Sequence, residues 1–472
     1  MSDREILSEI FLVAHSQTQP EDKALLALRA TWVCRYWKST ARNHSPLWAV
    51  ITISRVDCLE HFIARSKEAK LTIALRKINM PESDIWSPIL GAIRRVAYFA
   101  LVPKKPDALM ALSGSLEPDG SDTATLALRI LELDHVDILE LEFALNPIHT
   151  LILTTCAFFW ERSFGMSTTL TNLDIRYPTI RVAYTDILLQ LQNSPCIETV
   201  HLVEALTLPL QHTPTIHEPV TLPALRILDL SEGEANWMNA VLQMVRLLDL
   251  PGIQELQFWT EHCAMNINLI PQLLYAAHTA CQDFMITYAS ILTHAESWSQ
   301  ISIANDQDPS YDSSITLRID NAYDGSVFTI AMNHLTFQDV EYFHIGHYEN
   351  GISTDRWIEA VGGPNSHVSI LVLQFDAIDE FPGFAQDQFP QLKELIFYTE
   401  AESSEKIAIP MHIIQSGRQY TKLRRVVFCG EDEWDRSDEA IELLKKIGCK
   451  IRFKKGDYIA DYYEEERYVR LN

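Results

Sequence analysis

The sequence predicts an α/β protein in which short amino-terminal helices precede a long solenoid of short parallel strands with helical return segments. Apolar residues in the first fifty positions recur at helical spacing, and a six-residue apolar pattern recurs through the rest of the chain. The 472 residues also exceed the usual size of one globular core. An elongated array, in which each unit buries its apolar face by stacking on its neighbours, accounts for this length.

The first predicted helix begins near Glu5 and carries a single apolar face. Its apolar side chains fall at positions i, i+1, i+4, i+5 and i+8, which is the width of one packing surface. An acidic residue in the first turn favours the start of a helix at this point. The residues of the face are Ile6, Leu7, Ile10, Phe11 and Ala14.

A second helix is predicted after a break at residues 18–22. Pro20 and the carboxylates of Glu21 and Asp22 are typical of a helix start. The helix is predicted to end in the segment Val-Cys-Arg-Tyr-Trp-Lys at residues 33–38. Two or three short helices with this much apolar surface cannot bury it among themselves, so part of it must face another domain or another chain.

Three segments of this region resemble an F-box in residue type, order and spacing. They are Glu-Ile-Leu-x-x-Ile-Phe at 5–11, Val-Cys-Arg-x-Trp-Lys at 33–38 and Ser-Pro-Leu-Trp at 45–48. The family usually opens with Leu-Pro before the first helix, where this chain has Asp3-Arg4. Together with the region that follows, the chain resembles fungal-type F-box proteins with a divergent leucine-rich-repeat-like carboxyl-terminal region.

The resemblance implies a substrate-recognition subunit of an SCF-type cullin-RING ubiquitin ligase, which is an adaptor rather than an enzyme. Residues 1–54 would dock a Skp-type adaptor, and through it a cullin, while residues 55–472 would hold a protein substrate of unknown identity. The alternative is a repeat scaffold without a ubiquitin role, whose helices only cap the solenoid. The residues that match the motif, and that would contact the adaptor or form the local core, are Ile6, Leu7, Ile10, Phe11, Leu28, Val33, Cys34, Trp37, Leu47 and Trp48.

The solenoid is predicted from the pattern apolar-x-x-apolar-x-apolar. From Ile148 onward its first positions are 22, 27, 28, 28, 45, 42, 28, 24 and 31 residues apart, mostly near the leucine-rich-repeat period of about 20–29 residues. The two long intervals predict inserted loops or a degenerate repeat. The asparagine or cysteine that follows the strand in regular repeats is mostly absent, which predicts an irregular solenoid. The patterns begin at Ile93, Leu128, Ile148, Leu170, Ile197, Leu225, Ile253, Trp298, Val340, Val368, Leu392 and Leu423.

Two return segments have a helical pattern, at residues 234–248 and 437–447. Each is followed by a turn signal and then by a further strand. The apolar patterns that begin at Leu225 and Leu392 predict that Leu228 and Leu395 are buried strand residues of two separate repeats.

The net charge of −24 argues against a nucleic-acid partner, because phosphate binding needs a concentrated positive face. A protein target with a positive surface is compatible with this charge. The acidic runs at residues 431–433 and 464–466 would attract such a target, although most runs of this kind are solvated faces.

No apolar run is long enough for a membrane span, and the amino terminus has no pattern of a signal peptide. The eight cysteines are scattered singly, which favours reduced thiols. We therefore expect a cytoplasmic or nuclear protein without membrane contact.

Neither a catalytic nor a metal-binding constellation is evident. His344 and His347 lie near Glu341, but within a strand the two imidazoles would point in opposite directions. The pairs His262/Cys263 and His212/His217 lack further ligands at metal spacing. There is no Cys-x-x-Cys, no phosphate-binding glycine-rich loop and no nucleophile elbow. The sequence thus predicts no enzyme activity, no cofactor and no metal.

Overall fold

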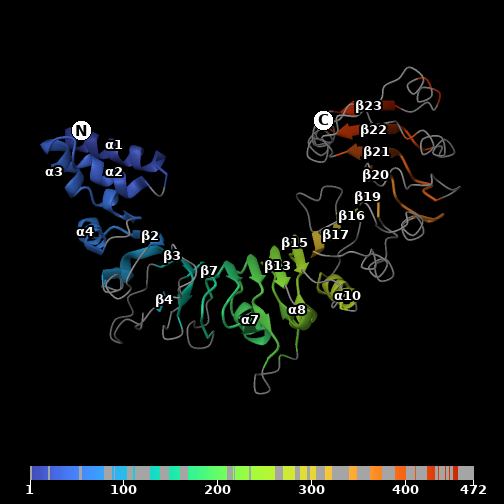
Figure 1. The fold of residues 1–472 in the computed structure, drawn as a ribbon, viewed down its shortest axis with the longest axis horizontal. Coiled ribbons are helices and arrows are strands. Elements are labelled where there is room, and N and C mark those ends of the chain that lie inside the picture. Colours follow the sequence, from blue (N-terminus) through green and yellow to red (C-terminus); the bar gives the residue numbers. More distant parts are fainter. Residues whose placement is uncertain are drawn as a thin grey trace. The chain divides into compact units, whose positions relative to one another are not determined.

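A computed structural model shows two compact units, Met1–Leu225 and Arg226–Asn472. Both are mixed α/β, and both are built on parallel strands (Figure 1). The residues that the structure describes are 3–19, 22–52, 56–78, 88–89, 91–103, 110–111, 128–138, 148–159, 168–209, 216, 218–232, 235–260, 269–281, 288–294, 298–304, 314–320, 340–347, 362–374, 388–399, 410, 422–430, 434, 442, 446 and 450–454.

Four helical segments begin the first unit, and the predicted opening helix is confirmed. Phe11 lies in their core, with its ring centroid 5.3 Å from that of Trp37. Trp48 is fully buried, and its indole N–H donates a hydrogen bond of 2.7 Å to the carbonyl oxygen of Ala41. The segments are α1 (Asp3–Gln17), α2 (Lys23–Ala30), α3 (Arg35–Asn43) and the 3-10 helix η2 (Ser45–Trp48).

The helix predicted to end at residues 33–38 is interrupted, because the chain breaks between α2 and α3. The region therefore has three short helices, within the two or three that the sequence predicts. The backbone of Cys34 is extended, and its sulfur accepts a hydrogen bond of 3.4 Å from the amide of Trp37. An acceptor at this position satisfies one of the amides left unpaired at a helix start, which favours a new helix there. The apolar spacing continues across the break and so conceals it in the sequence.

The helices lead directly into the first strands. β1 (Val50–Ile51) follows η2 and pairs in parallel with β2 (Leu71–Ile78), and α4 (Val56–Ser66) connects the two strands. Phe62 of α4 packs edge-on against Trp48, with 4.9 Å between the ring centroids. The amino-terminal helices and the beginning of the sheet therefore share one core.

Successive parallel strands then continue through the first unit, as the repeat pattern predicts. Leu131 lies opposite Leu151, which lies opposite Leu173, and all three are fully buried. Residues between the buried positions are half exposed, so each strand has one core face and one outward face. These strands are β3 (Val96–Pro103), preceded by η3 (Ile93–Arg95), then β5 (Ile130–Asp134), β7 (Thr150–Thr154), β8 (Asn172–Arg176) and β10 (Thr199–Val203).

A sharp corner follows four of these strands. His135, Thr155, Tyr177 and Glu204 come directly after β5, β7, β8 and β10 and have φ values of 51°, 51°, 50° and 48°. Non-glycine residues rarely adopt this left-handed conformation. After the corners the chain forms short strands and one return helix. They are β6 (Val136–Asp137), which pairs with β4 (Met110–Ala111), β9 (Val182–Ala183), α7 (Tyr184–Gln192), β11 (Leu206–Thr207) and β12 (Val220–Thr221).

The second unit begins with the same repeat. β13 (Ile227–Glu232) pairs in parallel with β15 (Glu255–Thr260), and Leu228 lies fully buried opposite Leu256. Two helices pack against each other beside these strands, and the first confirms the return helix predicted at residues 234–248. They are α8 (Ala235–Arg246), followed by the short β14 (Leu248–Asp249), and α10 (Ile270–Ala280).

The repeat predicted at Trp298 is wrong in direction. Its strand, β17 (Trp298–Ala304), is antiparallel to both of its neighbours, β16 (Tyr288–His294) and β18 (Ser314–Asp320). β18 pairs in parallel with β15, and β16 pairs in parallel with β19 (Tyr342–His347). The three strands between β15 and β19 thus lie in reverse order, which explains the two long intervals in the repeat.

The remaining strands of the second unit are again parallel, and the first three of them have buried residues on both faces. Leu371, Leu395 and Val426 are fully buried on one face, as predicted for Leu395. The other face is a buried apolar cluster of Tyr342, Ile370, Val372, Ile396, Val427 and Cys429. The strands are β20 (Ile370–Gln374), β21 (Glu394–Thr399), β22 (Arg425–Gly430) and β23 (Lys450–Lys454). The helix predicted at 437–447 lies outside the described residues, except for the helical Glu442 and Lys446.

Candidate docking surface

Burial divides the ten motif residues into three sets. Leu7 and Phe11 of α1, with exposed fractions of 5% and 2%, join Leu47 and Trp48 in the local core. Ile6, Ile10, Val33 and Cys34 are exposed to solvent, and Leu28 and Trp37 are half-buried. The structure therefore separates residues that hold the helices together from residues that are free to contact a partner.

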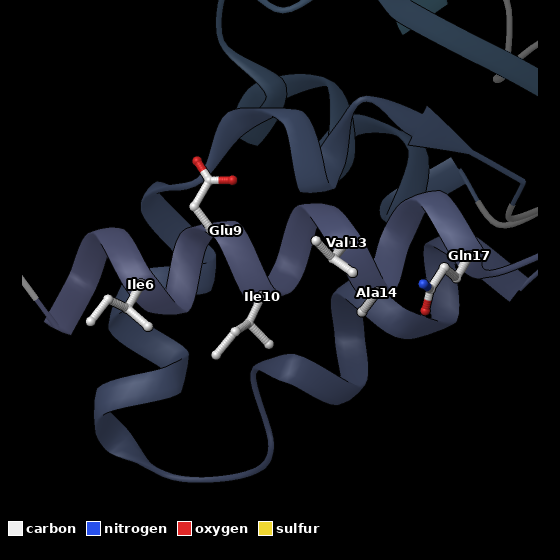
Figure 2. Close-up of a pocket in the computed structure, with 6 residues that line it drawn as sticks. All are labelled: Ile6, Glu9, Ile10, Val13, Ala14 and Gln17. Atoms are coloured by element: carbon white, nitrogen blue, oxygen red, sulfur yellow. The ribbon is translucent and has the colours of Figure 1, made fainter. Parts of the chain in front are cut away.

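One side of α1 forms a shallow apolar groove (Figure 2). Ile6, Ile10 and Val13 are 46%, 50% and 53% exposed, at positions i, i+4 and i+7 of the helix. Leu7 and Phe11 lie on the adjoining side of the helix and point into the core, because each follows an exposed residue by one position, which is a turn of about 100°. The groove is lined by Ile6, Glu9, Ile10, Val13, Ala14 and Gln17.

Exposed apolar side chains are concentrated in this region. Of thirteen large apolar side chains exposed in the described part of the chain, eight lie between Ile6 and Tyr36. The motif omits several of them, including Val13 and Trp32, which is 75% exposed. Contiguous or clustered apolar exposure of this kind marks interaction sites in soluble proteins. Val13 continues the i, i+4, i+7 spacing from Ile6, and this signal was present in the sequence.

Two half-buried histidines border the same helices. The imidazoles of His15 and His44 each have an Nε2 atom that is buried without a hydrogen-bond partner among the described residues. Burial lowers the pKa of His15, and Lys23 lowers it further. Burial also lowers the pKa of His44, against the opposing effect of Glu9. Both side chains are therefore more strongly biased to the neutral form than free histidine.

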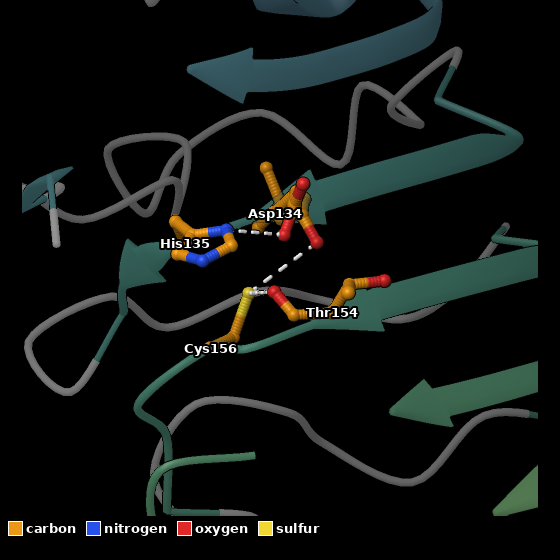
Figure 3. Close-up of polar contacts among 5 residues, drawn as sticks. Asp134, His135, Thr154 and Cys156 are labelled. Atoms are coloured by element: carbon orange, nitrogen blue, oxygen red, sulfur yellow. Dashed lines mark hydrogen bonds and ion pairs between the residues drawn. The ribbon is translucent and has the colours of Figure 1, made fainter. Parts of the chain in front are cut away.

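A buried cysteine, Cys156, directly follows the corner after β7 (Figure 3). The sulfur of Cys156 lies 3.3 Å from the carbonyl oxygens of both Leu133 and Thr154, which share its single S–H donor. Burial raises the pKa of this thiol to about 12. Cys156 follows the buried residues of β7 at the place where regular leucine-rich repeats carry asparagine or cysteine, so its spacing in the sequence is a signal for this position. Nearby, His135 Nδ1 lies 2.6 Å from Asp134 Oδ1 and takes no part in the contacts of Cys156.

The thiols should differ strongly in reactivity. Cys34 and Cys196 are exposed, whereas Cys156 and Cys281 are buried with pKa values raised to about 12. Because the thiolate is the reactive form, iodoacetamide should label the first pair at neutral pH and spare the second. Peptide mass spectrometry measures each site, with a fully denatured sample as the control. Rapid labelling of native Cys156 would contradict its structural role.

The structure describes some of the histidines and cysteines that the sequence offers as metal ligands. His344 is buried in β19, and burial lowers its pKa to about 4. Within the described residues, no group of three or more histidine, cysteine or carboxylate side chains is placed to hold a metal ion. The side chain of His347 and the pairs His262/Cys263 and His212/His217 lie outside the described side chains. None of the described helices is long and apolar enough to cross a bilayer.

Comparisons with known proteins do not assign the chain to a family. No model of a known protein family matches the sequence, and no curated protein matches it.

Proposed function

We propose that the chain is the substrate-recognition subunit of an SCF-type cullin-RING ubiquitin ligase. The groove of α1 docks a Skp-type adaptor, and the solenoid holds a protein target. The observation that carries this proposal is the exposed stripe of Ile6, Ile10 and Val13. It lies on a helix whose adjoining side anchors the core through the motif residues Leu7 and Phe11. The order of the three F-box-like segments supports the choice of partner.

The energetics of the groove favour a partner that removes it from water. Complete burial of an aliphatic side chain contributes about 1.5–3 kcal/mol. Ile6, Ile10 and Val13 are about half exposed. Burying the exposed half of all three side chains would therefore contribute roughly half of three such free energies. This contribution comes before any other contact of the interface is counted. A stable interface also needs polar contacts and a larger area, which the rest of the helical region has to provide.

We assign target binding to the solenoid because the strands of the first unit have an accessible outward face. Glu132 of β5 lies opposite Ile152 of β7, which lies opposite Asp174 of β8. Asp174 lies opposite His201 of β10, and all four positions are half-buried. Tyr98 donates a 2.7 Å hydrogen bond to Glu132, and Arg176 pairs with Asp174 through two 2.8 Å hydrogen bonds. A face of this polarity suits a polar protein surface, in keeping with a target that bears lysine and arginine.

The test is adaptor capture by the full chain. Ile10→Asp and Ile6→Asp should each weaken binding of a Skp-type adaptor by at least about 100-fold, because a carboxylate in a desolvated apolar interface costs several kcal/mol. Leu189→Asp on α7 is the matched control, since Leu189 is also a helical side chain, 39% exposed. Isothermal titration or co-purification measures the effect. Undiminished binding by both α1 variants would refute docking through the groove.

A second function, as a plain scaffold, is favoured by one observation. β1 pairs with β2 and Trp48 packs on Phe62, so the helices are also placed to cap the solenoid. In that case the wild-type chain would fail to capture the adaptor. Helix-breaking changes in α1 would then act only by lowering the stability of the first unit.

A further inference from the structure

The last described strand of the second unit, β23, leaves part of its apolar surface uncovered. In β22, Val426 and Phe428 are fully buried. Ile451 and Phe453 of β23 lie directly opposite them but are only half-buried. Each turn of a solenoid is buried against the next one, so the terminal turn needs a cover of another kind.

The uncovered surface includes the end of an aromatic stack. The rings of Phe397 and Phe428 are 15° from parallel, with centroids 5.3 Å apart. Those of Phe428 and Phe453 are 17° from parallel and 5.1 Å apart. Phe453 is the last described ring of this stack, and the two rings before it are fully buried. Aromatic rings gain from packing on one another, so a further aromatic side chain would suit this position.

The same strands carry a concentration of positive charge. Residues 391–399, 422–430 and 450–454, which form β21 to β23 and lead into them, contain seven lysines and arginines and one glutamate. This glutamate, Glu394, is buried and pairs with Arg425, with 3.1 Å between Oε1 and Nη1. The strands themselves supply no second carboxylate, in a chain with a net charge of −24. The exposed cations, which we call the basic edge, are Lys393, Lys422, Arg424, Lys450 and Arg452.

Three cations of the basic edge are neighbours where the strands begin. The amide of Arg424 donates a hydrogen bond of 2.8 Å to the carbonyl oxygen of Lys393, and the amide of Lys450 donates one of 2.9 Å to that of Arg424. Adjacent strands lie about 4.8 Å apart, so the three backbones lie within about 10 Å. Like charges held this close repel one another, and a run of carboxylates would stabilise them.

The sequence just after β23 supplies such a run. Residues 457–466, which lie outside the described part of the chain, read Asp-Tyr-Ile-Ala-Asp-Tyr-Tyr-Glu-Glu-Glu. This acidic segment contains five carboxylates, three tyrosines and no lysine or arginine. Its composition therefore matches both the basic edge and the open aromatic stack.

The acidic segment is also close enough along the chain to reach both features. β23 ends at Lys454. Ten further residues can span about 33 Å when fully extended. The start of β23 is about 13 Å back along the strand, and β21 is about 10 Å across the sheet. A tether of this length gives an effective concentration in the millimolar range.

We infer that the acidic segment binds in cis across the end of the second unit. Its carboxylates contact the basic edge, and its tyrosines cover the exposed parts of Ile451 and Phe453. A single exposed ion pair is weak, but the tether lets several form together. The contact closes the solenoid and occupies a surface that would otherwise attract polyanions. It does not depend on the proposed function.

The first test is cross-linking of the unmodified full chain. A carbodiimide couples a carboxylate to a lysine amine only where the two touch. Mass spectrometry should therefore find residues 464–466 coupled to Lys393 or Lys422, which are distant in the sequence. Coupling should fall by at least about tenfold in 1 M salt, where charges are screened beyond about 3 Å. Absence of this coupling would overturn the inference. Coupling found only between isotopically labelled and unlabelled copies would also overturn it, in favour of a second copy as the occupant.

The second test removes the charges of the acidic segment. Glu464→Gln, Glu465→Gln and Glu466→Gln together should make hydrogen exchange of the β23 amides about tenfold faster, because the end of the unit then opens more often. The full chain should also gain affinity for polyglutamate, by about fivefold or more, since the basic edge becomes accessible. Circular dichroism verifies that the variant is folded. A second set, Tyr458→Ser, Tyr462→Ser and Tyr463→Ser, keeps every charge and should speed the same exchange.

The matched control removes three charges from the other acidic run, after β22. It should stay within about twofold of the wild type in exchange and in polyglutamate binding, as expected of a surface change. Unchanged β23 exchange in either the glutamine or the serine set would overturn the inference. Equal acceleration in the control would do so too, because the effect would then follow net charge alone. The control substitutions are Glu431→Gln, Asp432→Asn and Glu433→Gln.

Discussion

Leu7→Asp is expected to unfold the amino-terminal helices, whereas Ile10→Asp leaves them folded. Leu7 is 5% exposed and lies in the core with Phe11, while Ile10, on the adjoining side of α1, is 50% exposed. A carboxylate forced into an apolar core costs several kcal/mol unless it is neutralised, which is a large part of the stability of a small unit. Hydrogen exchange of α1 to α3, followed by mass spectrometry, measures the difference.

The two variants also separate folding from docking. Loss of adaptor binding in Leu7→Asp would reflect loss of the helices, so only Ile10→Asp reports on the interface. Retained protection of α1 amides in Leu7→Asp would show that α1 packs in another register. The F-box-like pattern places both residues in the motif and does not distinguish their roles.

Leu228→Ala and Leu395→Ala should each lower the free energy of unfolding of the second unit by about 2–5 kcal/mol, the usual range for a buried leucine. Both side chains are fully buried, one in β13 and one in β21. Tyr275→Ala serves as the control, because Tyr275 of α10 lies in the same unit and is 69% exposed. It should change stability by less than about 0.5 kcal/mol. Denaturant melts followed by circular dichroism measure each value. Losses as small as the control's in both core variants would mean that these leucines are not core residues.

The strand cores were predictable because burial leaves a strong trace in the sequence. Leu131, Leu151, Leu173 and Leu228 each sit in the middle of the apolar pattern, and each is fully buried. Direction leaves no such trace, since parallel and antiparallel strands alternate in the same way. The pattern at Trp298 therefore predicted a strand correctly and its pairing wrongly.

The docking surface was predictable only as a region. The motif residues marked the helices, but periodicity alone did not distinguish the buried Leu7 from the exposed Ile6 beside it. The break before α3 was also hidden, because it depends on the local hydrogen bond between the Cys34 sulfur and the Trp37 amide. Apolar spacing does not encode such a bond.

The reversed strands β16, β17 and β18 have a consequence for the order of folding. A regular solenoid folds by adding one turn to the next, since each turn contacts only its sequence neighbours. Here β18 pairs with β15 and β16 pairs with β19, so these contacts form only after long loops close. Loop closure of this kind slows folding and ties the separate segments into one cooperative block. The first unit can grow turn by turn, but this part of the second unit must assemble all at once.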